Sequence, residues 1–386
     1  MLLFECVGDS TIIVPDSGPD GTTAPDVADK DVTGQDTQSD VIDAAACATD
    51  AGMLVCNGVC VDPKTSATNC GACNHDCLGG TCGVLDGGAT PLCQPIVLAS
   101  GITTSAFALA TDGTSVVFTD NSTGAYSLSV NGTSQTPFQV GSGSARPITI
   151  VNGNMYWMVL GNNSPNQIWK GQPGKTGAAA LNIGAGTLNS FPPVVPYGIA
   201  VDSQETYVGF LEYGSTTDYF GSCSLVTTPV CATSSKTGES ALPGNMVTDN
   251  AHLFWTEGSG NIAQTALSFG SVTNIITGQA VPNVMSMAGP GYFVWYNAGN
   301  ATIYRSPILS PTAQNLTTNT YVTSIAADAT NVYWSTTTSI MYVDQTGSGT
   351  PKVLVDNVQP GAIARDSKAI YWYNGDGTIM KVALPL

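Results

Sequence analysis

Cysteine is the residue type with the greatest potential for chemistry in this sequence. Eight of the eleven cysteines lie within residues 47–93, a segment without Phe, Tyr or Trp: Cys47, Cys56, Cys60, Cys70, Cys73, Cys77, Cys82 and Cys93. An even number of cysteines in a short segment predicts four disulfides, with the connectivity left open among about a hundred possibilities. So few apolar side chains cannot offset the entropy of ordering the segment, and covalent staples can.

A zinc site is the alternative use of these cysteines. The Cys70-Gly-Ala-Cys73 turn could direct two thiolates at one ion. Further ligands would be Cys77, Cys82 or His75. Zinc sites of this kind usually contain two such turns and the segment has one, so the pattern favours disulfides.

The remaining cysteines have separate roles. Cys223 and Cys231 are eight positions apart, and we predict a disulfide across a hairpin. Leu3-Phe4-Glu5-Cys6 has the spacing of a bacterial lipobox, which makes Cys6 a candidate for lipidation at the end of a signal peptide, although Glu5 replaces the small residue that such a box requires. The alternative is a stray cysteine beside a misplaced start codon.

Residues for acid–base or metal chemistry are few and scattered. His75 and His252 are the two histidines, and neither is near a serine or cysteine nucleophile motif. A lactonase-type metal site would need carboxylates such as Glu205, Glu212, Asp218 and Glu257, which have no diagnostic spacing. Asn374-Gly375-Asp376-Gly377 could wrap a calcium ion but fits a hairpin turn better. We therefore predict no catalytic residue, no metal ligand and no cofactor.

Charge and composition separate the chain into parts. Residues 1–95 contain 14 acidic and 2 basic residues, whereas residues 96–386 contain 14 and 9. With no basic cluster, the sequence excludes a nucleic-acid or anionic-membrane surface, and no apolar run is long enough to span a membrane. We predict a signal or lipobox remnant at 1–6, an acidic disordered linker at 7–46, a disulfide-stapled module at 47–93 and one large domain at 95–386.

Seven internal repeats define that large domain. Each contains a pair of aromatic or large apolar residues: Val117-Phe118, Tyr156-Trp157, Tyr207-Val208, Phe254-Trp255, Val294-Trp295, Tyr333-Trp334 and Tyr371-Trp372. In five of the repeats an aspartate lies six residues before the second member: Asp112, Asp202, Asp249, Asp328 and Asp366. Aspartate stabilises hairpin turns through its side chain, and a repeat of about 40 residues suits a four-stranded propeller blade. We expect the aromatic residues Trp157, Trp255, Trp295, Trp334 and Trp372 to pack between blades rather than to bind a ligand.

The predicted fold is therefore all-β, a seven-bladed β-propeller, with six or eight blades as alternatives. The last repeat lacks a fourth strand, and Pro95-Ile96-Val97-Leu98-Ala99 matches the fourth strand Pro351-Lys-Val-Leu-Val355 of another repeat. We expect this N-terminal strand to close the ring, which leaves no unpaired edge.

These motifs resemble a known family. Val332-Tyr-Trp-Ser335, Leu253-Phe-Trp-Thr-Glu257 and Ile370-Tyr-Trp-Tyr373 are similar to the Tyr-Trp-Thr-Asp and NHL-type repeats of extracellular and exported bacterial propellers, and Cys56-Asn-Gly-Val-Cys60 resembles a Cys-rich motif found beside them. The resemblance implies an extracytoplasmic location, either secreted or as a surface lipoprotein. It implies binding of a protein or glycan partner on the propeller faces. A metal-dependent lactonase or lyase at the central channel and a structural component of an envelope assembly are the alternatives.

Overall fold

The computed structural model describes residue 47 and residues 52–84, 90–102, 106–161, 166–181, 195–214, 217–226, 231–237, 244–318, 321–347 and 349–386. The chain divides into two units, Met1–Val41 and Ile42–Leu386, and all described residues belong to the second. Cys6 and the acidic linker predicted for 7–46 lie outside the described residues. Within the described part of the chain, no helix is long and apolar enough to cross a membrane.

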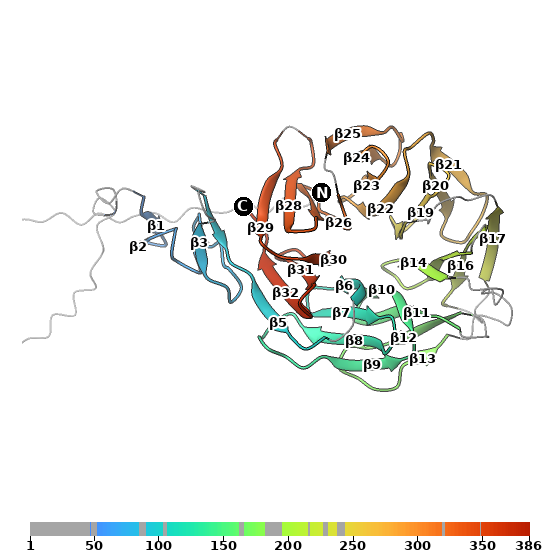
Figure 1. Cartoon of the computed structure of the whole chain (residues 1–386), viewed down its shortest axis with the longest axis horizontal. Helices are drawn as coiled ribbons and strands as arrows, with labels where there is room; N and C mark the ends of the chain where they lie inside the picture. The colour runs from blue at the N-terminus through green and yellow to red at the C-terminus, as the bar shows by residue number, and fades with distance from the viewer. Residues whose placement is uncertain are drawn as a thin grey trace, which may run out of the picture. The chain divides into compact units, whose positions relative to one another are not determined.

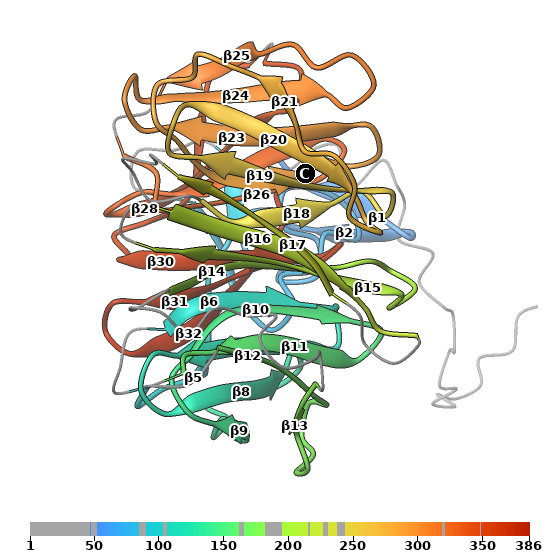
Figure 2. The same ribbon diagram turned by 90° about the vertical axis from the view of Figure 1, so that its right-hand side faces the viewer.

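Seven four-stranded antiparallel sheets surround a central axis, which confirms the predicted seven-bladed propeller (Figure 1). The inner strands of blades 1 to 7 are β6 (Ala106–Thr111), β10 (Ala145–Val151), β14 (Val195–Val201), β18 (Met246–Thr248), β22 (Pro282–Met287), β26 (Ser324–Ala327) and β30 (Pro360–Arg365). The second strands are β7 (Ser115–Asp120), β11 (Asn154–Val159), β15 (Tyr207–Tyr213), β19 (His252–Glu257), β23 (Tyr292–Asn297), β27 (Asn331–Ser335) and β31 (Ala369–Asn374). The third strands are β8 (Gly124–Ser129), β12 (Gln167–Gly171), β16 (Thr217–Ser224), β20 (Asn261–Ala266), β24 (Thr302–Pro307), β28 (Ser339–Asp344) and β32 (Thr378–Ala383). The outer strands are β9 (Phe138–Ser142), β13 (Ala179–Ala180), β17 (Cys231–Thr237), β21 (Thr273–Ile276), β25 (Gln314–Thr318), β29 (Lys352–Asp356) and β5 (Ile96–Ala99). Figure 2 shows β25, β24 and β23 of blade 5 side by side in that order.

The ring closes through the N-terminal strand β5. This strand pairs antiparallel with β32, with Ile379 opposite Ala99 and Lys381 opposite Ile96. The pairing confirms the predicted closure, because β5 supplies the strand that blade 7 lacks at its own C-terminus. In Figure 1 the cyan strand β5 lies beside the red strand β32. Lys381 is buried and donates a hydrogen bond of 3.1 Å to the carbonyl of Val130 in blade 1, which ties the last blade to the first.

Aspartate caps the first hairpin of five blades. In each case one carboxylate oxygen accepts hydrogen bonds of 2.6 to 2.9 Å from two backbone N–H groups of the turn that follows. The aspartates are Asp112, Asp202, Asp249, Asp328 and Asp366. The side chain thus satisfies turn amides that the sheet leaves unpaired, which explains this residue type at this position.

The second aromatic residue of each pair fills the space between neighbouring blades. Trp157, Trp255, Trp295, Trp334 and Trp372 are at most 1% exposed, and burying such a side chain stabilises the fold by about 4 kcal/mol. Blade 3 differs from the sequence prediction. Phe210, not Val208, lies opposite inner-strand Ile199, where a tryptophan stands in five other blades. The hairpin after Asp202 is longer than the others, because Asp202 pairs with Tyr207 whereas Asp112 pairs with Ser115.

In each of three blades, a side-chain hydroxyl group forms a hydrogen bond to the next blade. The residue directly after the second aromatic is Thr119, Thr256 or Ser335 in blades 1, 4 and 6. Thr256 donates to the carbonyl of Asn283 at 2.8 Å, and Ser335 donates to that of Gly361 at 2.9 Å. Thr119 donates to Arg146 in the same way. Each acceptor belongs to the inner strand of the next blade, so this position of the repeat stabilises the ring.

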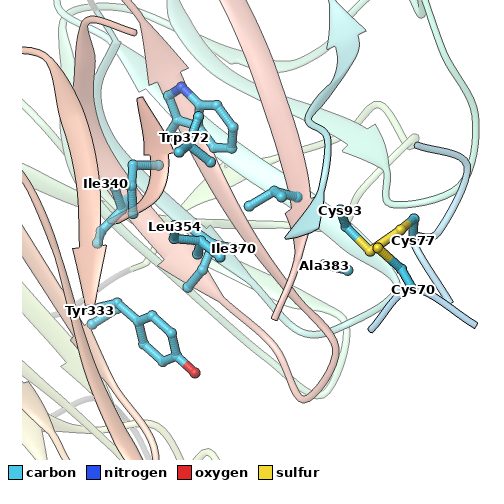
Figure 3. Packing of buried hydrophobic residues seen from close by; sticks show 13 residues of the cluster. Cys70, Cys77, Cys93, Tyr333, Ile340, Leu354, Ile370, Trp372 and Ala383 are labelled. Atoms are coloured by element: carbon cyan, nitrogen blue, oxygen red, sulfur yellow. A yellow bond between two sulfur atoms is a disulfide. The ribbon is translucent and has the colours of Figure 1, made fainter. Parts of the chain in front are cut away.

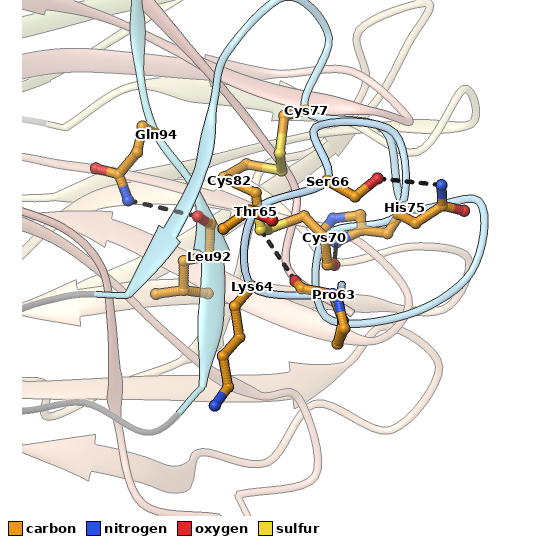
Figure 4. Close-up of a disulfide and its surroundings, with 12 residues drawn as sticks. Pro63, Lys64, Thr65, Ser66, Cys70, His75, Cys77, Cys82, Leu92 and Gln94 are labelled. Carbon is orange, nitrogen blue, oxygen red and sulfur yellow. Dashed lines mark hydrogen bonds between the residues drawn. A yellow bond between two sulfur atoms is a disulfide. The ribbon is translucent and has the colours of Figure 1, made fainter. Parts of the chain in front are cut away.

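The Cys-rich segment forms two short hairpins held by disulfides. Its strands are β1 (Leu54–Cys56), β2 (Val59–Val61), β3 (Cys82–Val84) and β4 (Pro91–Cys93). The disulfides are Cys47–Cys60, Cys56–Cys73, Cys70–Cys82 and Cys77–Cys93, and the propeller contains Cys223–Cys231. Figure 4 shows the Cys70–Cys82 bridge, whose Cys82 sulfur lies 3.1 Å from the carbonyl oxygen of Pro63.

The segment packs against blade 7. Cys70, Cys77 and Cys93 belong to one buried cluster with Ala383, Val382 and other apolar residues of blades 6 and 7 (Figure 3). His75 adds a polar contact, with its Nε2 atom 2.9 Å from the carbonyl of Leu384. The disulfides of the Cys-rich segment and strand β32, which closes the ring, therefore belong to one packed region.

Candidate functional site

The central channel of the propeller contains a cavity of about 720 Å³. All seven inner strands line it. An inner strand has a neighbour on one side only, so half of its backbone groups face the channel. Proline is tolerated in such an edge strand, and Pro147, Pro196, Pro282 and Pro360 lie near the beginning of four of them.

The lining is almost neutral. Among the described lining residues there is no Asp, Glu, His or Cys, and Arg365 is the one charged side chain. Arg365 already bonds within the protein: its Nε donates to the carbonyl of Ala327 at 2.6 Å, and its Nη1 donates to that of Asp366 at 2.9 Å. The polar side chains of the lining are otherwise amides and hydroxyls, including Asn245, Asn283 and Ser324.

Two of these side chains bond across to the next blade. Asn245, directly before β18, accepts a hydrogen bond from the N–H of Met285 in β22, and its amide donates to the carbonyl of the same residue, both at 2.7 Å. The hydroxyl of Ser324 accepts from the N–H of Ile363 in β30 at 3.1 Å. These bonds show that the backbone of an inner strand presents donors and acceptors to the channel.

The four carboxylates considered for a lactonase-type metal site do not meet. None of Glu205, Glu212, Asp218 and Glu257 lines the channel. Glu212, Asp218 and Glu257 are buried, in β15, β16 and β19. Glu212 accepts from the amide of Asn166 at 2.8 Å, and Glu257 accepts from that of Asn261 at 3.0 Å. In the described part of the chain, no group of three carboxylates or histidines has the spacing of a metal site.

Glu205 holds blades 2 and 3 together. It lies in the turn between β14 and β15 and bonds to Lys170 at 2.9 Å, to Asn154 and to the hydroxyl of Tyr156. Burial of Glu205 acts to raise its pKa, but the hydrogen bonds from these three partners outweigh burial and bring the pKa below its ordinary value. The ionised carboxylate of Glu205 therefore stabilises the interface between blades 2 and 3.

The histidines and the Asn-Gly-Asp-Gly segment also have structural contacts. His252 lies 3.3 Å from the Asp249 carboxylate at the tip of a hairpin. Asn374-Gly375-Asp376-Gly377 forms the turn between β31 and β32, as the sequence indicated, and the Asp376 carboxylate accepts from the N–H and the hydroxyl of Thr378. Both features are accounted for by turn formation.

The sulfur atoms of Cys70, Cys77 and Cys93 lie within 4.8 Å of one another. Each belongs to a disulfide, and a disulfide sulfur is not the thiolate that zinc requires. Cys73, the second cysteine of the candidate zinc turn, pairs with Cys56 instead. The arrangement is that of two neighbouring staples.

Solved structures of other propellers resemble this chain. The virginiamycin B lyase of Staphylococcus aureus is 16% identical, with a TM-score of 0.59 over 76% of this chain and 99% of the lyase. A streptogramin B lyase is also 16% identical, with a TM-score of 0.59 over 76% and 97%. U3-55K is 10% identical, with a TM-score of 0.58 over 75% and 98%. No family model matches the chain, and no curated protein is similar enough in sequence to match it. The likeness shows the propeller fold.

Asn245 and Ser324 are the site residues that motif analysis missed. Both stand one position before the inner-strand residue that lies opposite a tryptophan. Alignment of the seven inner strands would have revealed that this position is polar in two blades and apolar or glycine in the others.

Proposed function

We propose that this chain is an extracytoplasmic binding module of the exported, repeat-propeller kind, which holds a protein or glycan partner at the propeller face and central channel. The observation that carries the proposal is the lining of the channel. It combines a volume suited to a ligand with many hydrogen-bonding groups and with no Asp, Glu, His or Cys among the described lining residues. Such a site can recognise a ligand without transforming it.

The lyase alternative has less support. General acid–base catalysis needs a group that exchanges a proton near neutral pH. One of the solved virginiamycin B lyase structures is a catalytically inactive variant in which alanine replaces a histidine, with quinupristin bound. The two histidines of this chain lie in the Cys-rich segment and at a hairpin tip, away from the channel lining.

The disulfides support an oxidising compartment. Five disulfides in one chain are typical of exported proteins. We propose that Cys6 carries a lipid anchor and that residues 7–46 act as a tether between the anchor and the folded region. Intact-mass measurement of the protein from its native host tests the lipid, because diacylglycerol and acyl groups on Cys6 add a defined mass.

Glycan and peptide arrays probed with the full chain test the binding function. Asn283 is exposed where the inner strands begin and lines the channel, so Asn283→Trp should narrow the mouth and weaken binding at least tenfold. Leu309→Trp is the matched control in the same blade, because Leu309 is 97% exposed and does not line the channel. Equal binding by both variants would place the ligand elsewhere. Absence of any ligand together with tight self-association would favour an envelope component instead.

A further inference from the structure

The inner strands of the propeller differ in how their channel-facing backbone is satisfied. One residue of each strand lies opposite the second aromatic residue of its blade: Leu109, Ile148, Ile199, Met246, Met285, Ile325 and Ile363. We call them the ring residues. The bonds at Met285 and Ile363 show that the backbone of a ring residue points into the channel.

The side chain that covers a ring residue comes from the preceding blade, at the position just before that blade's own ring residue. Asn245 covers both the N–H and the C=O of Met285, and Ser324 covers the N–H of Ile363. For the other five ring residues the covering positions are Ala362, Ala108, Pro147, Gly198 and Val284. None of these has a side chain that can form a hydrogen bond.

Five ring residues are consequently open. Among the described residues, no side chain hydrogen-bonds to the backbone of Leu109, Ile148, Ile199, Met246 or Ile325. The open ring residues are 4% to 8% exposed. Met285, which Asn245 covers on both groups, is 0% exposed, and Ile363, which Ser324 covers on its N–H alone, is 5% exposed. Four of the open residues belong to consecutive blades, so blades 1 to 4 form one continuous open wall.

Asn245 shows which groups can bond to this wall. Its carboxamide accepts from the N–H and donates to the C=O of one residue, at 2.7 Å each, and in a strand pair the N–H and C=O of one residue of the neighbouring strand do the same. A residue of an extended peptide offers these two groups from its two flanking amides. The described lining has no charge apart from Arg365, which is already bonded, so nothing there selects an ionic ligand.

We propose that the channel binds a short extended peptide through its secondary amides, which pair with the open ring residues of blades 1 to 4. Pairing of a peptide with a free strand edge is an established mode of recognition. A volume of about 720 Å³ accommodates a ligand of a few residues. This inference rests on the proposed binding function and adds the chemistry of the ligand.

The first test uses acetyl-trialanine N-methylamide as the probe, with titration calorimetry of the full chain. We expect saturable binding of one peptide and little dependence on salt. An analogue with an ester in place of the central amide loses one N–H donor and should bind about five- to tenfold more weakly. Equal affinities for the amide and the ester would overturn the proposal.

The second test introduces a covering carboxamide at the equivalent position of another blade. Ala108 holds the same position relative to Ile148 of the next blade as Asn245 holds relative to Met285. The Ala108→Asn variant should therefore cover the backbone of Ile148 and weaken peptide binding about tenfold. Ala108→Leu is the control of similar size without an amide, and an equal loss in both variants would indicate a steric effect and contradict the proposal. Asn245→Ala uncovers Met285, so peptide binding should be retained or strengthened.

The outcomes separate this inference from the proposed function. If the peptide does not bind but an array ligand does, and Asn283→Trp abolishes that binding, the channel is a binding site of another chemistry and the amide inference is wrong. If neither the peptide nor any array ligand binds, both proposals are wrong.

Discussion

The Cys-rich segment and the propeller are stabilised in different ways. The segment at 47–93 has no aromatic residue, and its four disulfides each span 12 to 17 positions. A loop of this size contributes about 3 kcal/mol by restricting the unfolded chain. The propeller has one described disulfide and instead buries a tryptophan in five of its seven blades. The comparison teaches that covalent closure replaces an apolar core where composition cannot supply one.

Removal of β5 should destabilise the propeller more than any of the changes described below. A chain that begins at Gly101 lacks the outer strand of blade 7 and exposes the edge of β32, so we expect aggregation or loss of a single cooperative transition. A chain that begins at Leu92, with Cys93→Ser to remove the unpaired thiol, keeps β5 and should unfold cooperatively. Thermal unfolding and light scattering distinguish the two chains. Equal behaviour would mean that β5 does not determine ring closure, and the boundary near residue 95 would be wrong.

Reduction of the disulfides should unfold the segment and leave the ring folded. All six tryptophans lie in 95–386, so their fluorescence reports on the propeller alone. With a phosphine reductant we expect residues 52–84 to lose protection from hydrogen exchange, while the fluorescence midpoint falls by about 5 °C at most. The double variant Cys223→Ser, Cys231→Ser controls for the propeller disulfide. Stoichiometric zinc in the purified protein, with eight reactive thiols before reduction, would contradict the disulfide assignment.

Loss of a buried polar partner should have an intermediate effect within the propeller. The indole N–H of Trp295 donates to Asn297 at 3.1 Å, whereas the indoles of Trp157, Trp334 and Trp372 have no partner among the described residues. Asn297→Leu should lower the free energy of unfolding by about 1–3 kcal/mol, because the buried indole N–H loses its acceptor. Asn274→Leu, at an exposed position of the neighbouring blade, should change it by about 0.5 kcal/mol or less. Denaturant titration measures both, and similar losses would assign the effect to the substitution type.

The smallest expected effect is a pH dependence at the interface of blades 2 and 3. The pKa of Glu205 is lowered by its three hydrogen-bond partners, so the ionised form stabilises the fold above the pKa of the unfolded chain. This contribution is lost as the pH falls through the lower pKa of the folded protein. Between about pH 5 and about pH 3 the melting temperature should therefore fall less in Glu205→Gln than in the unchanged protein. Parallel curves would show that Glu205 is not a source of acid sensitivity.

Much of the propeller was predictable because its repeats carry local signals. Aspartate at the hairpins and an aromatic residue opposite the inner strand fix the register of most blades, and Ile96-Val97-Leu98 matched a missing strand. The prediction for blade 3 was wrong because its repeat was aligned on the pair Tyr207-Val208. The hairpin after Asp202 is longer than the others, so Phe210 takes the place assigned to Val208. The disulfide connectivity was beyond prediction, because spacing alone does not choose between pairings.

The channel was less predictable than the blades. Its lining is largely backbone, and the sequence does not report which backbone groups remain unpaired. The interblade contacts had a usable signal, since Thr119, Thr256 and Ser335 share one position of the repeat. That signal was hidden because other residue types occupy the position in the remaining blades, including Tyr296 and Tyr373.

The pairing of β5 with β32 also sets the order in which the molecule can be completed. During synthesis β5 emerges before any blade and its partner β32 is among the last segments to appear, since Ile379 pairs with Ala99. The first six blades can form as they emerge, but the seam waits for the end of the chain. The Cys77–Cys93 bridge ends three residues before Ile96, so a segment that oxidises early would hold the start of β5 in a fixed place. The disulfide-bonded segment would then hold β5 in position for the slowest folding step, its pairing with β32.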